Sequence, residues 1–145
     1  MEKVKSYVVH QQVVLNAEPE TVWDALTNPE KTKEYFFNCR VLSDWEAGGS
    51  ITFKGRMFWI IPIEMKGKIV KAEPGKLLKY TLKNGKGESA SNSTVTDELS
   101  YKDGKTTLAI TDDVGSGEGA EKRYHRSVKG WTKVLSGLKS YLADN

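Results

Sequence analysis

The C-terminal part of the chain carries the pattern that most restricts its fold. From about Glu118 to Leu142, apolar residues recur at alternating spacings of three and four, the period of one face of an α-helix. At 100° per residue they all lie within about 40° of one line along the helix. These residues are Tyr124, Val128, Trp131, Leu135, Leu138 and Leu142. A long helix with one apolar face must pack that face on a large apolar surface, which the rest of the chain has to supply.

The central part of the chain is predicted to supply that surface as β-strands. Runs rich in β-branched and aromatic residues are separated by the turn dipeptides Gly48-Gly49, Pro74-Gly75 and Asp103-Gly104. The predicted strands are Arg40–Trp45, Ser50–Met57, Ile63–Glu73, Lys76–Leu82, Thr94–Lys102 and Lys105–Val114. Strands that follow one another through short turns pair antiparallel.

The N-terminal part of the chain is predicted to form one strand and two short helices. The strand runs from Tyr7 to Leu15, where polar residues are interleaved with valines. Ala17-Glu18-Pro19-Glu20 follows, and proline with acidic residues is typical of a first helical turn. Asn28-Pro29-Glu30 repeats this signal, which predicts a second short helix ending near Phe36.

The last predicted hairpin has a defined register. If Asp103-Gly104 is a two-residue turn, Tyr101 pairs with Thr106, and side chains of one parity share a face. One face is then hydroxyl-rich and the other largely apolar. The apolar face carries Val95, Asp97, Leu99, Leu108, Ile110 and Asp112. The sheet therefore has an inner and an outer side, and the inner side includes two carboxyl groups.

These elements predict an α+β fold in which residues 1–145 form one domain. Seven antiparallel strands with glycine turns should curl around the long C-terminal helix, and two short helices should complete the layer. The length is that of one domain, and 38% apolar residues suffice for a core.

Composition excludes several classes of function. The net charge of +3 is small and its signs are interspersed, so no nucleic-acid interface is predicted. The longest apolar run, Met57 to Ile63, is too short to span a membrane. The single Cys39 and the lack of an N-terminal signal pattern favour a cytoplasmic protein. Two isolated histidines, His10 and His125, have no metal-ligand spacing, and no metal or other cofactor is predicted.

Several segments, in order, resemble the helix-grip fold of the START-like (SRPBCC) superfamily, which includes the birch-pollen-allergen-like proteins. The branch that is most similar is related to the C-terminal domain of the heat-shock chaperone ATPase activator. The segments that carry the resemblance are Ala17 to Trp23, Trp45 to Gly49, Gly67 to Leu78, Thr106 to Thr111, and Gly130-Trp131 with Leu135 and Leu138.

The resemblance implies an elongated, mostly apolar cavity between the curved sheet and the C-terminal helix. Members of the superfamily include lipid and hormone carriers, polyketide cyclases, ring-hydroxylase subunits and chaperone regulators. Two features depart from the pattern: Asp97 stands where similar sequences have an apolar inward residue, and Met57 to Ile63 is unusually aromatic for a connection. That connection is a lid or cavity lining, a buried strand, or an association surface.

The candidate ligand site combines inward residues of the sheet with residues of the helix face. It comprises Phe36, Phe37, Phe53, Met57, Trp59, Met65, Tyr80, Leu82, Val95, Asp97, Leu99, Tyr124, Val128 and Trp131. The alternative is that the same side chains meet and simply fill the interior.

Asp97 and Asp112 have two interpretations. Inside the pocket, either would be a polar anchor or an acid–base group, and Asp97 is the predicted ligand anchor. In the alternative, Asp112 is solvated at a strand end and Asp97 is hydrogen-bonded by Tyr80 or Tyr124.

Three functions follow from these features. The first is non-covalent binding of a small hydrophobic or amphipathic molecule in the cavity. The second is a chaperone-regulator-like interaction module, whose partner is a chaperone or a second copy of the chain. The third is a cyclase- or dehydratase-type enzyme that uses Asp97 or Asp112.

Overall fold

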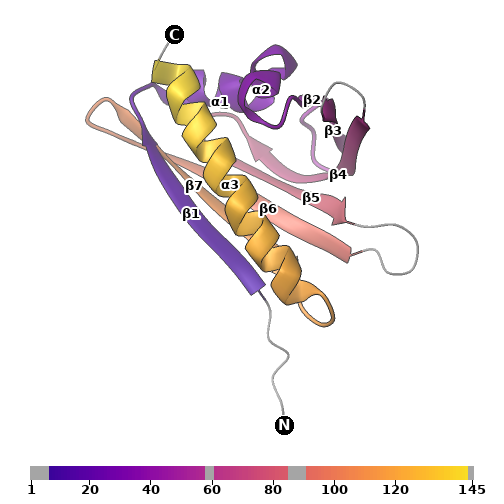
Figure 1. Cartoon of the computed structure of the whole chain (residues 1–145). Helices are drawn as coiled ribbons and strands as arrows, with labels where there is room; N and C mark the ends of the chain where they lie inside the picture. Colours follow the sequence, from indigo (N-terminus) through magenta and orange to yellow (C-terminus); the bar gives the residue numbers. More distant parts are fainter. Residues whose placement is uncertain (1–6, 58–60, 85–90, 144–145) are drawn as a thin grey trace.

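The computed structural model describes residues 7–57, 61–84 and 91–143, which form an antiparallel sheet and three helices (Figure 1). The elements are β1 (Tyr7–Leu15), α1 (Pro19–Thr27), α2 (Pro29–Tyr35), β2 (Arg40–Ser43), β3 (Ser50–Met57), β4 (Ile61–Glu73), β5 (Leu77–Asn84), β6 (Ser91–Lys102), β7 (Lys105–Gly115) and α3 (Ala120–Ala143). The seven strands lie in the order β1-β7-β6-β5-β4-β3-β2, and all pairs are antiparallel. The predicted α+β helix-grip architecture is confirmed.

Element boundaries differ from the prediction at a few ends. The predicted strand Arg40–Trp45 stops at Ser43, because Trp45 has a φ of 61° and leaves the extended conformation. The side chains of Ser43 and Asp44 accept hydrogen bonds from the backbone N–H groups of Trp45 and Glu46 in this turn. Such local bonds compete with strand pairing and end it.

The β6–β7 hairpin has the predicted register. Asp103 and Gly104 both have positive φ, 53° and 80°, as a type I′ turn requires. Tyr101 pairs with Thr106, and Asp97 pairs with Ile110. Along β7 the inward positions are buried and the outward positions are partly exposed, so the predicted inner face is the core face.

The pairing of β4 with β5 is irregular. A register shift lies between Ile69 and Lys71, and Val70 is left exposed. At Gly67 the two strands approach so closely that a Cβ atom would lie 1.6 Å from the carbonyl oxygen of Thr81. Only glycine fits there, and this close approach lets the sheet curl around the helical layer.

Helix α3 lies across the concave side of the sheet, with α1 and α2 beside its C-terminal end (Figure 1). The amide of Gln11 on β1 donates to the carbonyl of Val128 on α3 at 3.1 Å. Arg123 holds the β7–α3 loop, since its guanidinium donates to the carbonyl oxygens of Val114, Ser116 and Glu118. Within the described residues, no helix has the length and apolar character needed to cross a membrane.

Candidate binding site

An apolar pocket lies between α3, the two short helices and the inner face of the sheet. Its void has a volume of about 20 Å³, which is room for about one water molecule. Its lining residues come from every layer of the fold. They are Leu26, Thr32, Tyr35, Phe36, Val41, Trp45, Ile51, Phe53, Leu78, Tyr80, Asp97, Leu108, Ile110, Trp131, Val134, Leu135 and Leu138.

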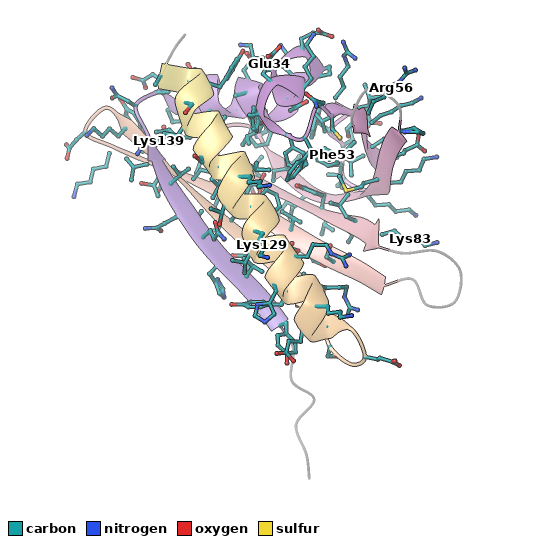
Figure 2. The ribbon with its side chains drawn as sticks, in the orientation of Figure 1. Glu34, Phe53, Arg56, Lys83, Lys129 and Lys139 are labelled. Carbon is teal, nitrogen blue, oxygen red and sulfur yellow. The ribbon has the colours of Figure 1, made fainter. Side chains whose placement is uncertain are left out.

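Aromatic rings form one wall of the pocket. The ring of Phe36 stacks on Phe53 with centroids 4.7 Å apart and meets Trp131 edge to face at 5.8 Å. Phe53, labelled in Figure 2, lies beside α3 and also contacts Tyr80 at 5.8 Å. Phe37 lies against Phe36 but is 44% exposed, so this row of rings reaches from the pocket to the surface.

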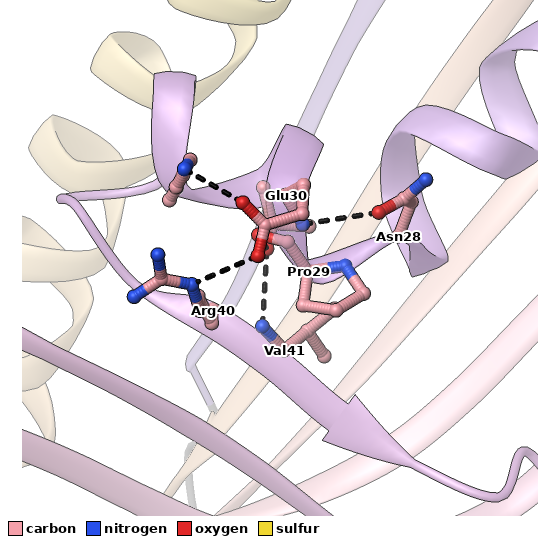
Figure 3. A network of polar contacts seen from close by, with 7 residues as sticks. Asn28, Pro29, Glu30, Arg40 and Val41 are labelled. Atoms are coloured by element: carbon pink, nitrogen blue, oxygen red, sulfur yellow. Dashed lines mark hydrogen bonds and ion pairs between the residues drawn. The ribbon is translucent and has the colours of Figure 1, made fainter.

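A polar network holds α2 in place beside the pocket (Figure 3). Asn28 caps the helix by accepting from the backbone N–H of Glu30 at 3.0 Å. The Glu30 carboxylate pairs with Lys33 and Arg40, and the N–H of Val41 on β2 donates to the Thr32 hydroxyl at 3.0 Å. These bonds join α2 to β2, and they hold Thr32 and Tyr35 of α2 against the pocket.

Asp97 on β6 is a buried pocket residue that is only 4% exposed. Its Oδ1 atom has no hydrogen-bond partner among the described residues. Burial, with the nearby charge of Asp112 as a second cause, raises the pKa of Asp97 to about 8. The interpretation in which Tyr80 or Tyr124 donates to Asp97 is wrong, because neither hydroxyl provides the missing bond. Tyr124 instead packs its ring on Tyr7.

Asp112 on β7 is buried as well, and the interpretation that it is solvated at a strand end is wrong. It is 6% exposed, since α3 covers this end of the strand. Its Oδ2 atom accepts from the hydroxyl of Ser127 at 2.5 Å and from Nε1 of Trp131 at 3.0 Å. Its Oδ1 atom is buried and has no hydrogen-bond partner in the part of the chain that the structure describes. Burial raises the pKa of Asp112, while the two donors act in the opposite direction.

The predicted site residues divide into several groups in the structure. Phe36, Phe53, Tyr80, Asp97 and Trp131 line the pocket. Leu82 and Val95 are buried in the same core, and Met65, Leu99, Tyr124 and Val128 pack partly buried around it. Phe37 lies at the surface over Gly130.

The aromatic connection from Met57 to Ile63 is largely outside the described part of the structure. Trp59 and the side chain of Met57 both fall there. The three interpretations of this connection therefore remain predictions.

Isolated titratable residues do not form a second site. Cys39 is a buried thiol, and burial raises its pKa. His125 is exposed on α3 and lies 3.8 Å from Glu121. In the described parts of the chain, no group of three or more histidine, cysteine, aspartate or glutamate side chains is placed to hold a metal ion.

The contribution of α2 to the pocket was not predicted from the sequence. Thr32 and Tyr35 are both buried, and each side chain has a hydrogen-bond partner. The Tyr35 hydroxyl donates to the carbonyl of Ala25 at 2.6 Å. A helix of two turns has too few residues for a clear apolar period, so no signal in the sequence indicated which side of α2 faces inward.

Fold and pocket together define a helix-grip α+β protein of the START-like superfamily. The family model described as Activator of Hsp90 ATPase homolog 1-like protein matches residues 16–143, and the chain belongs to this family. No protein of curated function matches the chain significantly.

Several solved structures are similar over nearly the whole chain. A Cytophaga hutchinsonii protein solved in solution is 31% identical, with a TM-score of 0.76, and the match covers 99% of this chain and 97% of that one. A Mesorhizobium loti protein has 21% identity and a TM-score of 0.80, and the match covers 95% of this chain and 98% of that one. The Aha1 dimer from Colwellia psychrerythraea has 20% identity and a TM-score of 0.72, and the match covers 93% of this chain and 95% of that one. At these last two identities the likeness shows the fold alone.

Proposed function

We propose that this protein binds a small, mostly apolar molecule in the pocket between the sheet and α3, without covalent chemistry. The observation that carries the proposal is the buried carboxyl of Asp97, which lines a mostly apolar pocket and has an oxygen with no hydrogen-bond partner among the described residues. Ligand pockets are mostly apolar with a few polar groups that orient the ligand. A carboxyl that serves only packing would cost stability at this position.

Access to the pocket for anything larger than water requires a side chain to move. Phe36 lines the pocket and is 9% exposed, and its neighbour Phe37 lies at the surface. Rotation of these two rings would connect the void of about 20 Å³ with solvent. The ligand would then occupy the space between Phe53 and Trp131 that the Phe36 ring now fills.

Native mass spectrometry of freshly purified protein tests this proposal. The expected result is a reproducible excess mass that is lost on denaturation and whose exact mass identifies the class of molecule. Protein that carries no excess mass, and that also binds no small apolar probe in solution, would contradict it.

A second candidate is a regulatory protein–protein interaction module. It is favoured by the small volume of the void, which fits a filled core as well as a binding site. The family is named after an activator of the Hsp90 ATPase, and one similar structure is an Aha1 dimer. A twofold mass in the same native spectrum would support a homodimer, and stimulation of a purified Hsp90-type ATPase would support a chaperone partner. Both results in the absence of small-molecule binding would favour this candidate over the first.

A further inference from the structure

The pocket and its edge have a deficit of hydrogen-bond donors. Asp97 and Asp112 each have a buried Oδ1 atom that accepts no hydrogen bond from the described part of the chain. Asp97 pairs with Ile110, and Asp112 lies two residues further along β7 on the same face. Diagonal neighbours of this kind are typically about 7–8 Å apart. Two buried carboxyl groups therefore lie on neighbouring strands of one sheet face, and each has an oxygen to which no described residue donates.

The pocket's own polar groups do not supply those donors. The hydroxyls of Thr32 and Tyr35 donate to backbone carbonyls of Pro29 and Ala25, and the indole N–H of Trp131 donates to Asp112 Oδ2. Tyr80 and Trp45 also line the pocket, and neither donates to an Oδ1 atom of the two aspartates. Among the described residues that line the pocket, none is a lysine, an arginine or a histidine. At the carboxyl end of the pocket, a ligand therefore meets oxygen atoms that can accept hydrogen bonds and that favour a positive charge when ionised.

We infer that the ligand is a small amphipathic amine whose ammonium group donates to the free oxygen of Asp97 beside Asp112, while its apolar body lies against Phe53 and Trp131. This inference rests on the proposed function of the pocket. An ammonium group has three donors, no acceptor and a positive charge, so it matches both the donor deficit and the carboxyl pair. It is close to a water molecule in size and fits the void of about 20 Å³. The surrounding rings add cation–π attraction.

Amine binding should depend on pH through Asp97. The titratable groups that face Asp97 are Asp112 from β7, Tyr80 from β5 and Tyr35 from α2, and the lining residues of α3 are not titratable. Burial raises the pKa of both tyrosines, so they stay protonated and neutral. Asp97, with a pKa of about 8, must lose its proton to pair with an ammonium group. The affinity for the amine should therefore rise about tenfold from pH 6 to pH 7, because the ionised fraction changes tenfold per pH unit below the pKa.

The test uses three probes with the same apolar body, hexylamine, hexanol and hexanoic acid, titrated by ligand-observed NMR. At pH 8 we expect the wild-type protein to bind hexylamine about tenfold or more tightly than hexanol, since a hydrogen bond to a charged group adds that much affinity. Asp97→Asn should remove the preference for hexylamine over hexanol. Glu98→Gln is the matched control, because Glu98 is the exposed neighbour on the outer face of β6 and its loss should change nothing.

The outcomes separate this inference from the proposed function. Hexanol binding as tight as hexylamine binding, or an amine preference that survives Asp97→Asn, would overturn the amine assignment while the pocket remains a binding site. Binding of none of the three probes would overturn both statements. A preference that rises with pH in the wild-type protein and is absent in Asp97→Asn would establish the inference.

Discussion

Asp112 on β7 and Trp131 on α3 are joined by a buried hydrogen bond, with Oδ2 of the carboxylate 3.0 Å from Nε1 of the indole. Ser127, one turn earlier on α3, donates to the same oxygen. This carboxylate therefore fastens the helix to the sheet at the edge of the pocket. Because Trp131 is a wall of the pocket, the bond also sets the orientation of that wall.

The Ser127 bond should contribute measurably to stability. Ser127→Ala removes one of two donors to a buried carboxylate, and we expect the free energy of unfolding to fall by about 1–2 kcal/mol at pH 7. Ser136→Ala is the control, since Ser136 is exposed on the same helix. Alanine there should raise the free energy of unfolding by a few tenths of a kcal/mol. Urea unfolding measures both. Equal effects of the two changes would show that the bond contributes little.

Asp97 should make the protein less stable as the pH rises. Its pKa is about 8 in the folded protein against an ordinary value of 3.8, so between these values the unfolded chain is ionised while the folded protein holds the proton. The unfolding free energy should fall from about pH 4 to about pH 8, by up to about 1.4 kcal/mol per pH unit from this group.

Asp97→Asn should reduce that slope and stabilise the protein at pH 8, whereas Glu98→Gln should keep the slope of the wild-type protein. Urea unfolding midpoints, measured at several pH values between about 4 and 8, give the three slopes to be compared. An unchanged slope in Asp97→Asn would mean that Asp97 ionises in the folded protein at an ordinary pKa.

Removing the Phe36 ring should enlarge the pocket. Phe36→Ala deletes a ring that stacks on Phe53 at 4.7 Å and contacts Trp131, so the free energy of unfolding should fall by about 3–5 kcal/mol. The variant should bind hexanol more tightly than the wild-type protein, because the new cavity adjoins the existing void. Phe37→Ala is the control. Because Phe37 is 44% exposed, this change should lower the free energy of unfolding by less than about 1 kcal/mol. Thermal unfolding and probe titration would measure both effects, and a similar loss in the two variants would contradict this account.

Replacing each of two glycines of α3 by alanine should have different effects on the stability of the protein. At Gly130 an added Cβ would meet the Phe37 ring at 3.8 Å, an ordinary contact, so Gly130→Ala should stabilise the helix by up to about 1 kcal/mol. At Gly137 it would lie 3.3 Å from Cβ of Tyr35, so α2 would have to move and Gly137→Ala should not stabilise the protein. Differential scanning calorimetry of the two variants tests the contrast, which would fail if both raised the melting temperature equally.

Local signals in the chain were sufficient for much of the fold. Asp103-Gly104 predicted the turn and, through it, the pairing of Tyr101 with Thr106, because a two-residue turn with positive φ allows one register. The apolar period of the last helix predicted α3 and its buried side, including Trp131 and Leu138. These features depend on residues near one another in sequence.

The candidate site was predicted only in part, because its members meet through contacts over long sequence separations. Tyr35 reaches the pocket by way of a helix whose orientation is set by bonds to β2, and no local pattern indicates that orientation. Phe37 was expected inside, but with a φ of 49° it turns outward over Gly130. The solvated state expected for Asp112 was wrong because only the position of α3 decides whether that strand end is covered.

The sequence by itself determined the order of the elements, the register of the last hairpin and the face on which Asp97 and Asp112 lie, since side-chain period and turn chemistry act over a few residues. The tertiary structure alone decided which apolar residues surround the void, which carboxyl oxygen gains donors from α3, and that burial raises the pKa of Asp97 to about 8. The physical reason is that burial and electrostatic environment depend on neighbours from other elements, and those neighbours are set only when the helix packs on the sheet.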